Sequence, residues 1–172
     1  MKRCVLTGGS RAGKSTVLNE LERRGFVTVP EAAQIMIQES IDKYGAHPDD
    51  INEVEFLKTI LLKRLELEEA AKGDTVFIDR GIFDGIAYAR FFKAKVPEEF
   101  ELFTDSKRYH KVFLLEMLPT YEQTEVRRES PEMRETMHSL IKEAYAMVGY
   151  KLIFVPVLSV EERADFILQR ID

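Results

Sequence analysis

The chain has 172 residues, 45% of them hydrophobic and 32% charged, which is the balance of one globular domain with a full apolar core. Its net charge of −5 argues against a nucleic-acid partner, and no apolar run is long enough for a signal peptide or a membrane span. A single cysteine, Cys4, excludes an internal disulfide and suits the reducing cytoplasm, where we expect the protein. Three scattered histidines form no metal-binding pattern, and composition favours no particular oligomeric state.

The first predicted strand, residues 4–7, leads into the phosphate-binding pattern G-x-x-x-x-G-K-S/T. The loop consists of Gly8, Gly9, Ser10, Arg11, Ala12, Gly13, Lys14, Ser15 and Thr16. A helix is expected next, because Val17, Leu18 and Leu21 share one helical face. Strand, glycine loop and helix occur in the order that the motif needs. We therefore predict a nucleoside triphosphate site, and the alternative is a glycine-rich turn that binds nothing.

Each residue type in this loop has an expected role. Gly8 and Gly13 allow backbone angles that are closed to other residues, so successive N–H groups can surround a phosphate at a helix N-terminus. Lys14 is expected to reach the β- and γ-phosphates, and the Ser15 hydroxyl to bind Mg²⁺. Thr16 is expected to support the α-phosphate or the helix. The predicted cofactors are ATP, with GTP as the alternative, and Mg²⁺.

An acidic residue follows the second predicted strand, residues 26–29, which comes after a helix stop at Gly25. This residue is Glu31, and a helix is predicted over residues 32–44. Ligands in open α/β sheets bind at the carboxyl ends of the strands. Glu31 is therefore a candidate base for an acceptor hydroxyl. The alternative is a first-turn acid that the helix dipole stabilises.

A second acidic residue follows the clearest strand, residues 75–78, which comes after a predicted helix over 51–72. Asp79 is a candidate Mg²⁺ ligand, directly or through water, and Arg80 is a candidate contact to phosphate or acceptor. The alternative for Asp79 is a turn residue that caps the next helix, residues 82–92. Asp84 in that helix lies near the same edge of the sheet. Whether it is a site residue or a structural residue stays open.

A polar segment, residues 119–131, is the predicted lid. It follows a mixed connection over 93–107 and a strand at 112–115, and it carries Arg127 and Arg128. An arginine brought over the γ-phosphate would stabilise phosphoryl transfer, and the alternative is two solvated arginines. Ser130-Pro131 is a good start for a helix over 131–148. A last strand at 152–155 precedes a helix from residue 159 to about 171, which opens on a capping box.

Five strands that alternate with helices predict a three-layer α/β/α sandwich around a parallel sheet, as a single P-loop NTPase domain over residues 1–172. The motif residues resemble those of the P-loop nucleoside and nucleotide kinases, which include deoxynucleoside, thymidylate and ribosylnicotinamide kinases. Within them the chain is most similar to the AAA-type P-loop family that contains the NadR-like ribosylnicotinamide kinase domain. Further marks of this similarity are Val29-Pro30-Glu31-Ala32-Ala33, Asp79-Arg80-Gly81, Asp84 with Ala87-Tyr88-Ala89, the Arg127 segment, Gly149-Tyr150, and Val155-Pro156 before Ser159–Arg163.

The resemblance implies a strand order of 2-3-1-4-5, ATP with Mg²⁺, and a small nucleoside-like or nucleotide-like acceptor. The roles that it implies are phosphate and Mg²⁺ binding by Gly13, Lys14 and Ser15, proton acceptance from a 5′-hydroxyl by Glu31, contact with metal and phosphates by Asp79 and Arg80, and lid closure by Arg127. Thr124-Glu125 stands where many relatives have Asp-Gly. The choice between Arg127 and Arg128 therefore stays open.

The predicted function is transfer of the γ-phosphoryl group of ATP to a hydroxyl or phosphate of a small acceptor. One alternative is a P-loop ATPase or GTPase that acts as a nucleotide-dependent switch. The guanine-binding pattern N-K-x-D is absent, because Asn19 and Asn52 are each followed by Glu, which disfavours an ordinary GTPase. A nucleic-acid end kinase is a third class, and the acidic net charge argues against it.

Overall fold

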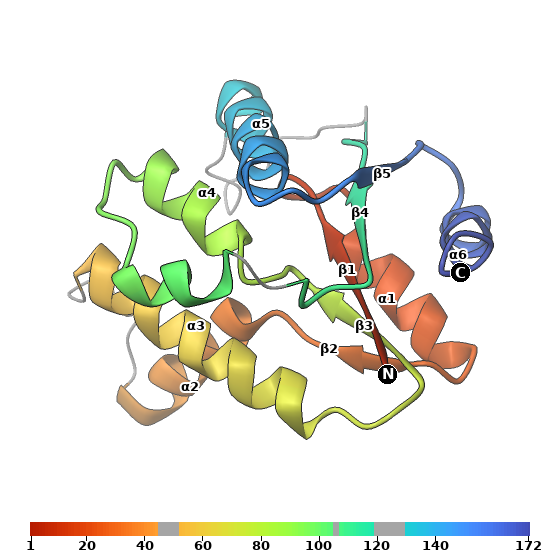
Figure 1. Cartoon of the computed structure of the whole chain (residues 1–172), viewed down its shortest axis with the longest axis horizontal. Helices are drawn as coiled ribbons and strands as arrows, with labels where there is room; N and C mark the ends of the chain where they lie inside the picture. The colour runs from red at the N-terminus through yellow and green to blue at the C-terminus, as the bar shows by residue number, and fades with distance from the viewer. Residues whose placement is uncertain (45–51, 105–106, 119–129) are drawn as a thin grey trace.

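The sheet has five parallel strands in the predicted order, β2-β3-β1-β4-β5 (Figure 1). The computed structural model describes residues 1–44, 52–104, 107–118 and 130–172. The strands are β1 (Lys2–Thr7), β2 (Val27–Val29), β3 (Thr75–Asp79), β4 (Lys111–Leu115) and β5 (Leu152–Val155). The helices are α1 (Lys14–Arg23), α2 (Ala32–Tyr44), α3 (Glu53–Ala70), α4 (Asp84–Phe91), α5 (Pro131–Met147) and α6 (Val160–Leu168), with a short 3₁₀ helix, η1 (Glu98–Phe103).

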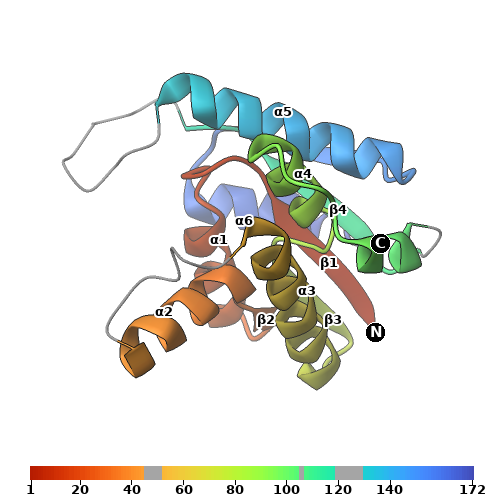
Figure 2. The same ribbon diagram turned by 90° about the vertical axis from the view of Figure 1, so that its left-hand side faces the viewer.

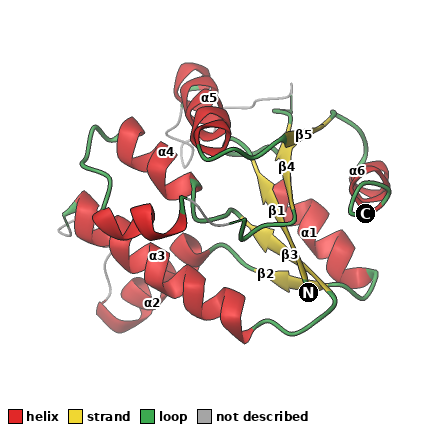
Figure 3. Cartoon of the chain, in the orientation of Figure 1, coloured by secondary structure: helices red, strands yellow, loops and turns green. Residues whose placement is uncertain are grey.

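Helices cover both faces of the sheet, which makes the predicted three-layer sandwich (Figure 3). α1 and α6 pack on one face, and α3, α4 and α5 lie side by side over the other (Figures 1 and 2). Side chains of each strand alternate between the faces, so Val5 packs toward α3–α5 whereas Cys4 and Leu6 pack toward α1 and α6. Burial on both faces explains why these strands are nearly continuous apolar runs.

β1 lies at the centre of the sheet, between β3 and β4. Its residues from Cys4 onward are buried, and burial raises the pKa of the Cys4 thiol to about 11. Strands β2 and β3 lie on one side of β1, and β4 and β5 lie on the other. The loop after β1 is therefore at the point where the strand order reverses, which is where open α/β sheets bind ligands. No helix in the described part of the chain is long and apolar enough to cross a bilayer.

The predicted element boundaries agree with the structure to within a few residues. The last helix ends at Leu168 rather than at about residue 171. α4 begins at Asp84 rather than at residue 82, because the Asp84 carboxylate accepts the Gly81 N–H and a turn forms before the helix. The capping box predicted for α6 is present. The Ser159 hydroxyl accepts the Glu162 N–H at 3.2 Å, and the Glu162 carboxylate accepts the Ser159 N–H at 3.0 Å.

The predicted lid lies almost entirely outside the described residues. Its last two residues start α5 as expected, because Ser130 is the N-cap and its hydroxyl accepts the Met133 N–H at 3.2 Å. Arg127 and Arg128 belong to residues 119–129, which lie outside the part of the chain that the structure describes. Their roles stay predictions.

Candidate active site

The loop between β1 and α1 surrounds a small cavity. Gly8 and Gly13 have positive φ angles of 137° and 81°, and Arg11 has a φ of 61°. A Cβ on Gly8 would lie 2.7 Å from the carbonyl oxygen of Leu115 in β4, so only glycine fits at this close approach. The cavity has a volume of about 290 Å³ and is lined by Ser10, Arg11, Gly13, Lys14, Ser15, Thr16, Glu31, Gln34 and Arg80.

Lys14 begins α1 and is buried, with 6% of its surface exposed. Its Nζ donates hydrogen bonds to the carbonyls of Gly8 (3.2 Å) and Gly9 (3.0 Å). Burial, with a smaller contribution from the Arg80 guanidinium, lowers the pKa of Lys14 from its usual 10.5 to about 8. The ammonium is therefore held without full hydration in the cavity, where an anionic ligand would stabilise its charge.

Ser15 and Asp79 meet at the mouth of the loop, where the Ser15 hydroxyl donates to Asp79 Oδ2 at 3.3 Å. Asp79 Oδ1 is buried and has no hydrogen-bond partner among the described residues. Burial raises the pKa of Asp79, and the Lys14 charge opposes this shift. The Thr16 hydroxyl instead donates to the Gly13 carbonyl at 2.8 Å and supports the start of the helix.

The hydroxyl oxygen of Ser15 and Oδ1 of Asp79 fit a magnesium ion. Mg²⁺ prefers oxygen ligands and usually keeps several waters beside one or two protein groups and the substrate phosphates. The hydroxyl of Ser15 and the unsatisfied oxygen of Asp79 would be the protein ligands. No three Asp, Glu, His or Cys side chains within the described ranges could hold a metal by themselves, so phosphates and water would have to complete the coordination shell.

Glu31 and Arg80 form a buried ion pair between the loop and the rest of the site. Arg80 Nε lies 2.8 Å from Glu31 Oε1, and the two side chains are 5% and 12% exposed. Arg80 also donates from Nη1 to the Gly8 carbonyl at 3.2 Å and to Asp84 Oδ1 at 3.1 Å. Its guanidinium lies over the ring of Tyr88, 5.4 Å from the centroid. The arginine therefore contacts both the phosphate loop and the proposed base.

Asp84 is brought into the site, at the centre of a buried hydrogen-bond network. Its Oδ1 accepts the Thr7 hydroxyl at 2.7 Å as well as Arg80 Nη1. Its Oδ2 accepts the Tyr145 hydroxyl at 2.7 Å and the Gly81 N–H at 3.0 Å. Four donors satisfy this carboxylate in the interior, and Asp84 fixes one side of the Arg80 guanidinium.

The backbone of Arg80 adopts a left-handed conformation with a φ of 63°. Such a conformation costs on the order of 1–3 kcal/mol in a non-glycine residue and persists only where surrounding contacts hold it. Arg64 of α3, which is buried, donates from Nη1 to the carbonyls of Asp79, at 3.0 Å, and of Arg80. The next N–H, that of Gly81, is held by Asp84 and by the Tyr145 hydroxyl at 3.1 Å.

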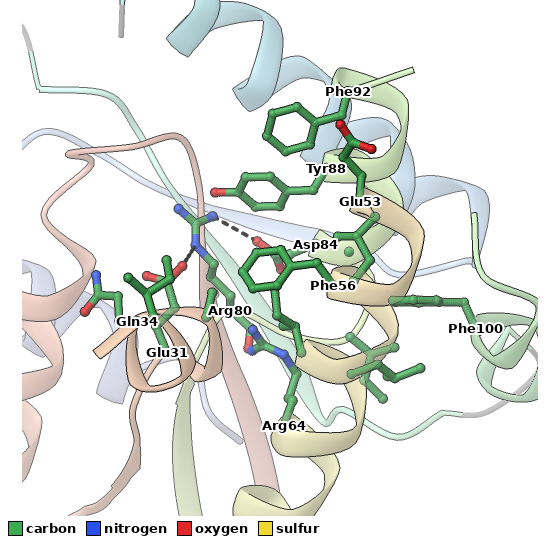
Figure 4. Close-up of a pocket in the computed structure, with 17 residues that line it drawn as sticks. Glu31, Gln34, Glu53, Phe56, Arg64, Arg80, Asp84, Tyr88, Phe92 and Phe100 are labelled. Carbon is green, nitrogen blue, oxygen red and sulfur yellow. Dashed lines mark hydrogen bonds and ion pairs between the residues drawn. The ribbon is translucent and has the colours of Figure 1, made fainter. Parts of the chain in front are cut away.

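A second, more apolar cavity of about 520 Å³ adjoins the first and shares Glu31, Gln34 and Arg80 with it. Figure 4 shows aromatic side chains around this cavity, which come from α3, from α4, from the C-cap of α4 and from η1. These side chains are Phe56, Tyr88, Phe92 and Phe100. The rings of Tyr88 and Phe92 are stacked, with centroids 6.2 Å apart. The cavity is therefore suited to a flat, partly apolar molecule.

Several residues of this site lie outside the glycine-loop motif and the acidic strand ends that mark it in the sequence. Thr7, Arg64 and Tyr145 hold the network from three separate elements, and no local pattern marks them. His138 of α5 also reaches the loop, since its Nδ1 accepts the Gly9 N–H at 3.3 Å. Burial lowers the pKa of His138, which favours the neutral ring that this contact needs.

Comparison with known proteins gives the family. The chain belongs to the AAA domain family, whose model matches residues 3–163. No curated protein matches the chain in sequence. Structural neighbours among the solved structures show the same fold.

Three of these neighbours are nucleotide-related proteins. Deoxyadenosine kinase from M. mycoides, solved with dCMP and dCDP, has a TM-score of 0.65 and 16% identity over 98% of this chain and 97% of its own. Thymidylate kinase from Candida albicans has a TM-score of 0.68 and 14% identity, and the shares covered are 98% and 89%. The NadR protein in complex with NR has a TM-score of 0.66 and 17% identity, with 90% of this chain but 43% of NadR covered.

Proposed function

We propose that the chain is a small-molecule kinase that transfers the γ-phosphoryl group of ATP, bound with Mg²⁺, to a hydroxyl of a nucleoside-like acceptor. The observation that carries this proposal is that two cavities meet at one ion pair. The polar cavity of the glycine loop would hold the triphosphate, and the aromatic cavity the acceptor. Glu31 and Arg80 line both.

The residues at the junction suit in-line transfer. Glu31 would take the proton of the acceptor hydroxyl, whose oxygen then bonds to the γ-phosphorus as the bond to the β–γ bridging oxygen breaks. ADP and the phosphorylated acceptor are the products. Lys14 and Arg80 would neutralise the charge that moves between the phosphates. A bound Mg²⁺ would supply further charge neutralisation and orientation of the phosphates, with Ser15 and Asp79 as its protein ligands.

The charges around the aromatic cavity favour a hydroxyl acceptor over a phosphate acceptor. Its charged lining consists of Glu31, Glu53, Asp84, Arg64 and Arg80. Both arginines are engaged, Arg80 by two carboxylates and Arg64 by backbone carbonyls. A dianionic acceptor phosphate would meet three carboxylates and no unengaged cation among the described lining residues, so an uncharged or cationic acceptor fits better.

The family and the neighbours support the same class. Two of the structural neighbours are kinases of a deoxynucleoside and of a nucleotide, and NadR was solved with NR. Residues 1–172 would act as one P-loop domain, and residues 119–131 as a lid that brings Arg127 or Arg128 over the nucleotide. We expect this activity in the cytoplasm.

The test is consumption of ATP with Mg²⁺ in the presence of single acceptors from a panel of nucleosides, nucleoside monophosphates and ribosylnicotinamide. We expect at least one nucleoside-like hydroxyl acceptor to raise turnover far above the level of the Lys14→Ala variant. The same panel with GTP decides the donor. If no acceptor raises turnover above the Lys14→Ala background, the kinase proposal is wrong. Acceptor-independent hydrolysis would instead favour a nucleotide-dependent switch.

A further inference from the structure

Arg163 of α6 is a buried cation beneath the phosphate loop. It is 2% exposed, and its guanidinium donates to three backbone carbonyls. These are Ala12 (Nη1, 2.6 Å), Glu116 (Nη2, 3.0 Å) and Pro156 (Nε, 3.0 Å). Within the described residues it forms no ion pair with a carboxylate. Burial lowers the pKa of Arg163, because the interior disfavours its charged form.

A buried charge without an ionic partner is costly unless its hydrogen bonds compensate for the lost hydration. The contacts to Glu116 and Pro156 tie together the segments that follow β4 and β5. Those segments are already linked by the Glu116 N–H, which donates to the Val155 carbonyl at 3.0 Å. The third contact, to Ala12, is the shortest of the three and reaches the loop itself.

The geometry of the peptide unit shows what this contact does. The Ala12 carbonyl and the Gly13 N–H belong to one planar, trans unit and point in opposite directions. Arg163 holds the carbonyl away from the cavity, and Ala12 is fully buried whereas Gly13 lines the cavity. The Gly13 N–H has no hydrogen-bond partner among the described residues. It is therefore turned toward the cavity as an unused donor.

A second arginine makes a similar contact from the other helix. Arg134 of α5 is buried, and its Nε donates to the Ser10 carbonyl at 3.3 Å. The same planarity directs the N–H of Arg11 away from Arg134, and Arg11 also lines the cavity. By contrast, the Gly9 N–H is already bound by His138. Two helices that flank the loop thus each fix the orientation of one of its peptide planes.

We propose that Arg163 is a positioning residue for polyphosphate binding, which aims the Gly13 N–H into the cavity by holding the Ala12 carbonyl, with Arg134 in the same role for the Arg11 N–H. This inference rests on the proposed function, because it requires that the loop binds a polyphosphate. The guanidinium charge also polarises the peptide unit that it holds, so the Gly13 N–H becomes a stronger donor. Lysine would keep the charge but could not serve three carbonyls at once.

The test compares Arg163→Met and Arg163→Lys with wild type and with a control, Arg170→Met. Arg170 is exposed beyond the end of α6, where its guanidinium donates to the Phe166 carbonyl and lies over the Phe166 ring. Calorimetry with Mg²⁺ would measure ATP and inorganic tripolyphosphate. Because one oriented donor is lost, we expect Arg163→Met to weaken both ligands by about tenfold or more, Arg163→Lys by less, and Arg170→Met by less than about twofold. Circular dichroism without ligand would establish that each variant is folded.

A second readout separates positioning from general stability. The Gly13 amide resonance of the tripolyphosphate complex should shift in both Arg163 variants and stay in place in the control. Equal affinity of wild type and Arg163→Met would overturn the inference, as would a loss confined to ATP, since that would place the effect on the nucleoside. If Arg163→Met does not fold, Arg163→Lys decides, and wild-type affinity in that variant also overturns it. Failure of the wild-type protein to bind either ligand would instead count against the proposed function.

Discussion

Glu31 Oε1 and Arg80 Nε lie 2.8 Å apart where the phosphate cavity and the aromatic cavity meet. The carboxylate proposed to take a proton and the guanidinium proposed to neutralise phosphate charge are therefore one ion pair. Arg80 is held from behind by Asp84 at 3.1 Å. Its side chain is consequently fixed before any ligand arrives, as electrostatic catalysis requires.

Replacement of Glu31 by glutamine removes the proposed base and keeps the shape of the side chain. We expect the turnover number to fall by about 10²–10⁴-fold, the usual contribution of general base catalysis, with little change in ATP affinity. The matched control is Glu39→Gln on α2, because that carboxylate is exposed and pairs only with Lys63 among the described residues, at 3.4 Å. A fall of less than about tenfold for Glu31→Gln would mean that another group accepts the proton.

The lowered pKa of Lys14, about 8, predicts pH-dependent nucleotide binding. Above pH 8 the free protein carries mostly neutral Lys14, and a bound triphosphate favours the ammonium, so binding takes up a proton. Affinity for ATP should therefore decrease as the pH rises from 7 to 9.5. Calorimetry at pH 9 in two buffers of different ionisation enthalpy should show proton uptake, and Lys14→Met should abolish it. Uptake that persists in this variant would assign the proton to another group.

The unsatisfied oxygen of Asp79 predicts a metal-dependent defect. Asp79→Asn should raise the Mg²⁺ concentration needed for half-maximal turnover by about 10–100-fold, in the range found when groups that support a bound metal are lost. Asp74→Asn, an exposed change just before the same strand, serves as the control. Chelation of Mg²⁺ should stop turnover in all three proteins. An unchanged Mg²⁺ requirement in Asp79→Asn would remove this residue from the metal site.

Gly85 gives a test of the aromatic cavity. A Cβ there would lie 2.5 Å from Cζ of Phe100, which lines the cavity. Gly85→Ala should push this ring, raise the KM for the acceptor and lower the free energy of unfolding by about 1–3 kcal/mol, as overpacking does. ATP affinity should not change. The outcome that contradicts an acceptor site here is a shifted ATP affinity with an unchanged acceptor KM.

Gly25→Ala is the control for this substitution. Gly25 has a φ of 91°, and nothing lies within 4 Å of an added Cβ. Only backbone strain is expected, with a cost of about 1–2 kcal/mol. Denaturant unfolding and acceptor kinetics of both variants would separate loss of stability from a change in the cavity.

The fold was largely predictable because its determinants are local. Most strands contain a short apolar run bounded by polar residues, since helices cover both faces of the sheet. Helix starts at Ser130 and Ser159 followed from capping patterns, and both are present. The start of α4 was predicted two residues too early, because an Asp84 side-chain contact to Gly81 delays the helix, and such a contact leaves no mark in the periodicity.

The site was predictable only where a motif or a strand end marks it. The structure brings together Lys14, Ser15, Glu31, Asp79 and Arg80. The glycine-loop motif marks the first two in the sequence, and the ends of β2 and β3 mark the other three. Their catalytic and metal-binding roles remain predictions.

Residues that tertiary packing supplies were not predictable. Thr7 lies 77 residues before Asp84 in the chain, and Tyr145 lies 61 residues beyond it, so no local pattern places Thr7 or Tyr145 at this carboxylate. Arg163 has one local feature that could have marked it. It is a charged residue next to the apolar positions Ala164 and Ile167, with which it shares the buried side of α6.

The burial of Cys4 at the centre of the sheet has a practical consequence. Its thiol is fully buried, and burial raises its pKa to about 11, so neither access nor ionisation permits alkylation in the native protein. Modification by iodoacetamide should require global opening of the molecule. Because Cys4 is the only cysteine, its labelling rate at a pH where an exposed thiol ionises would report unfolding of every variant described above, without an engineered probe.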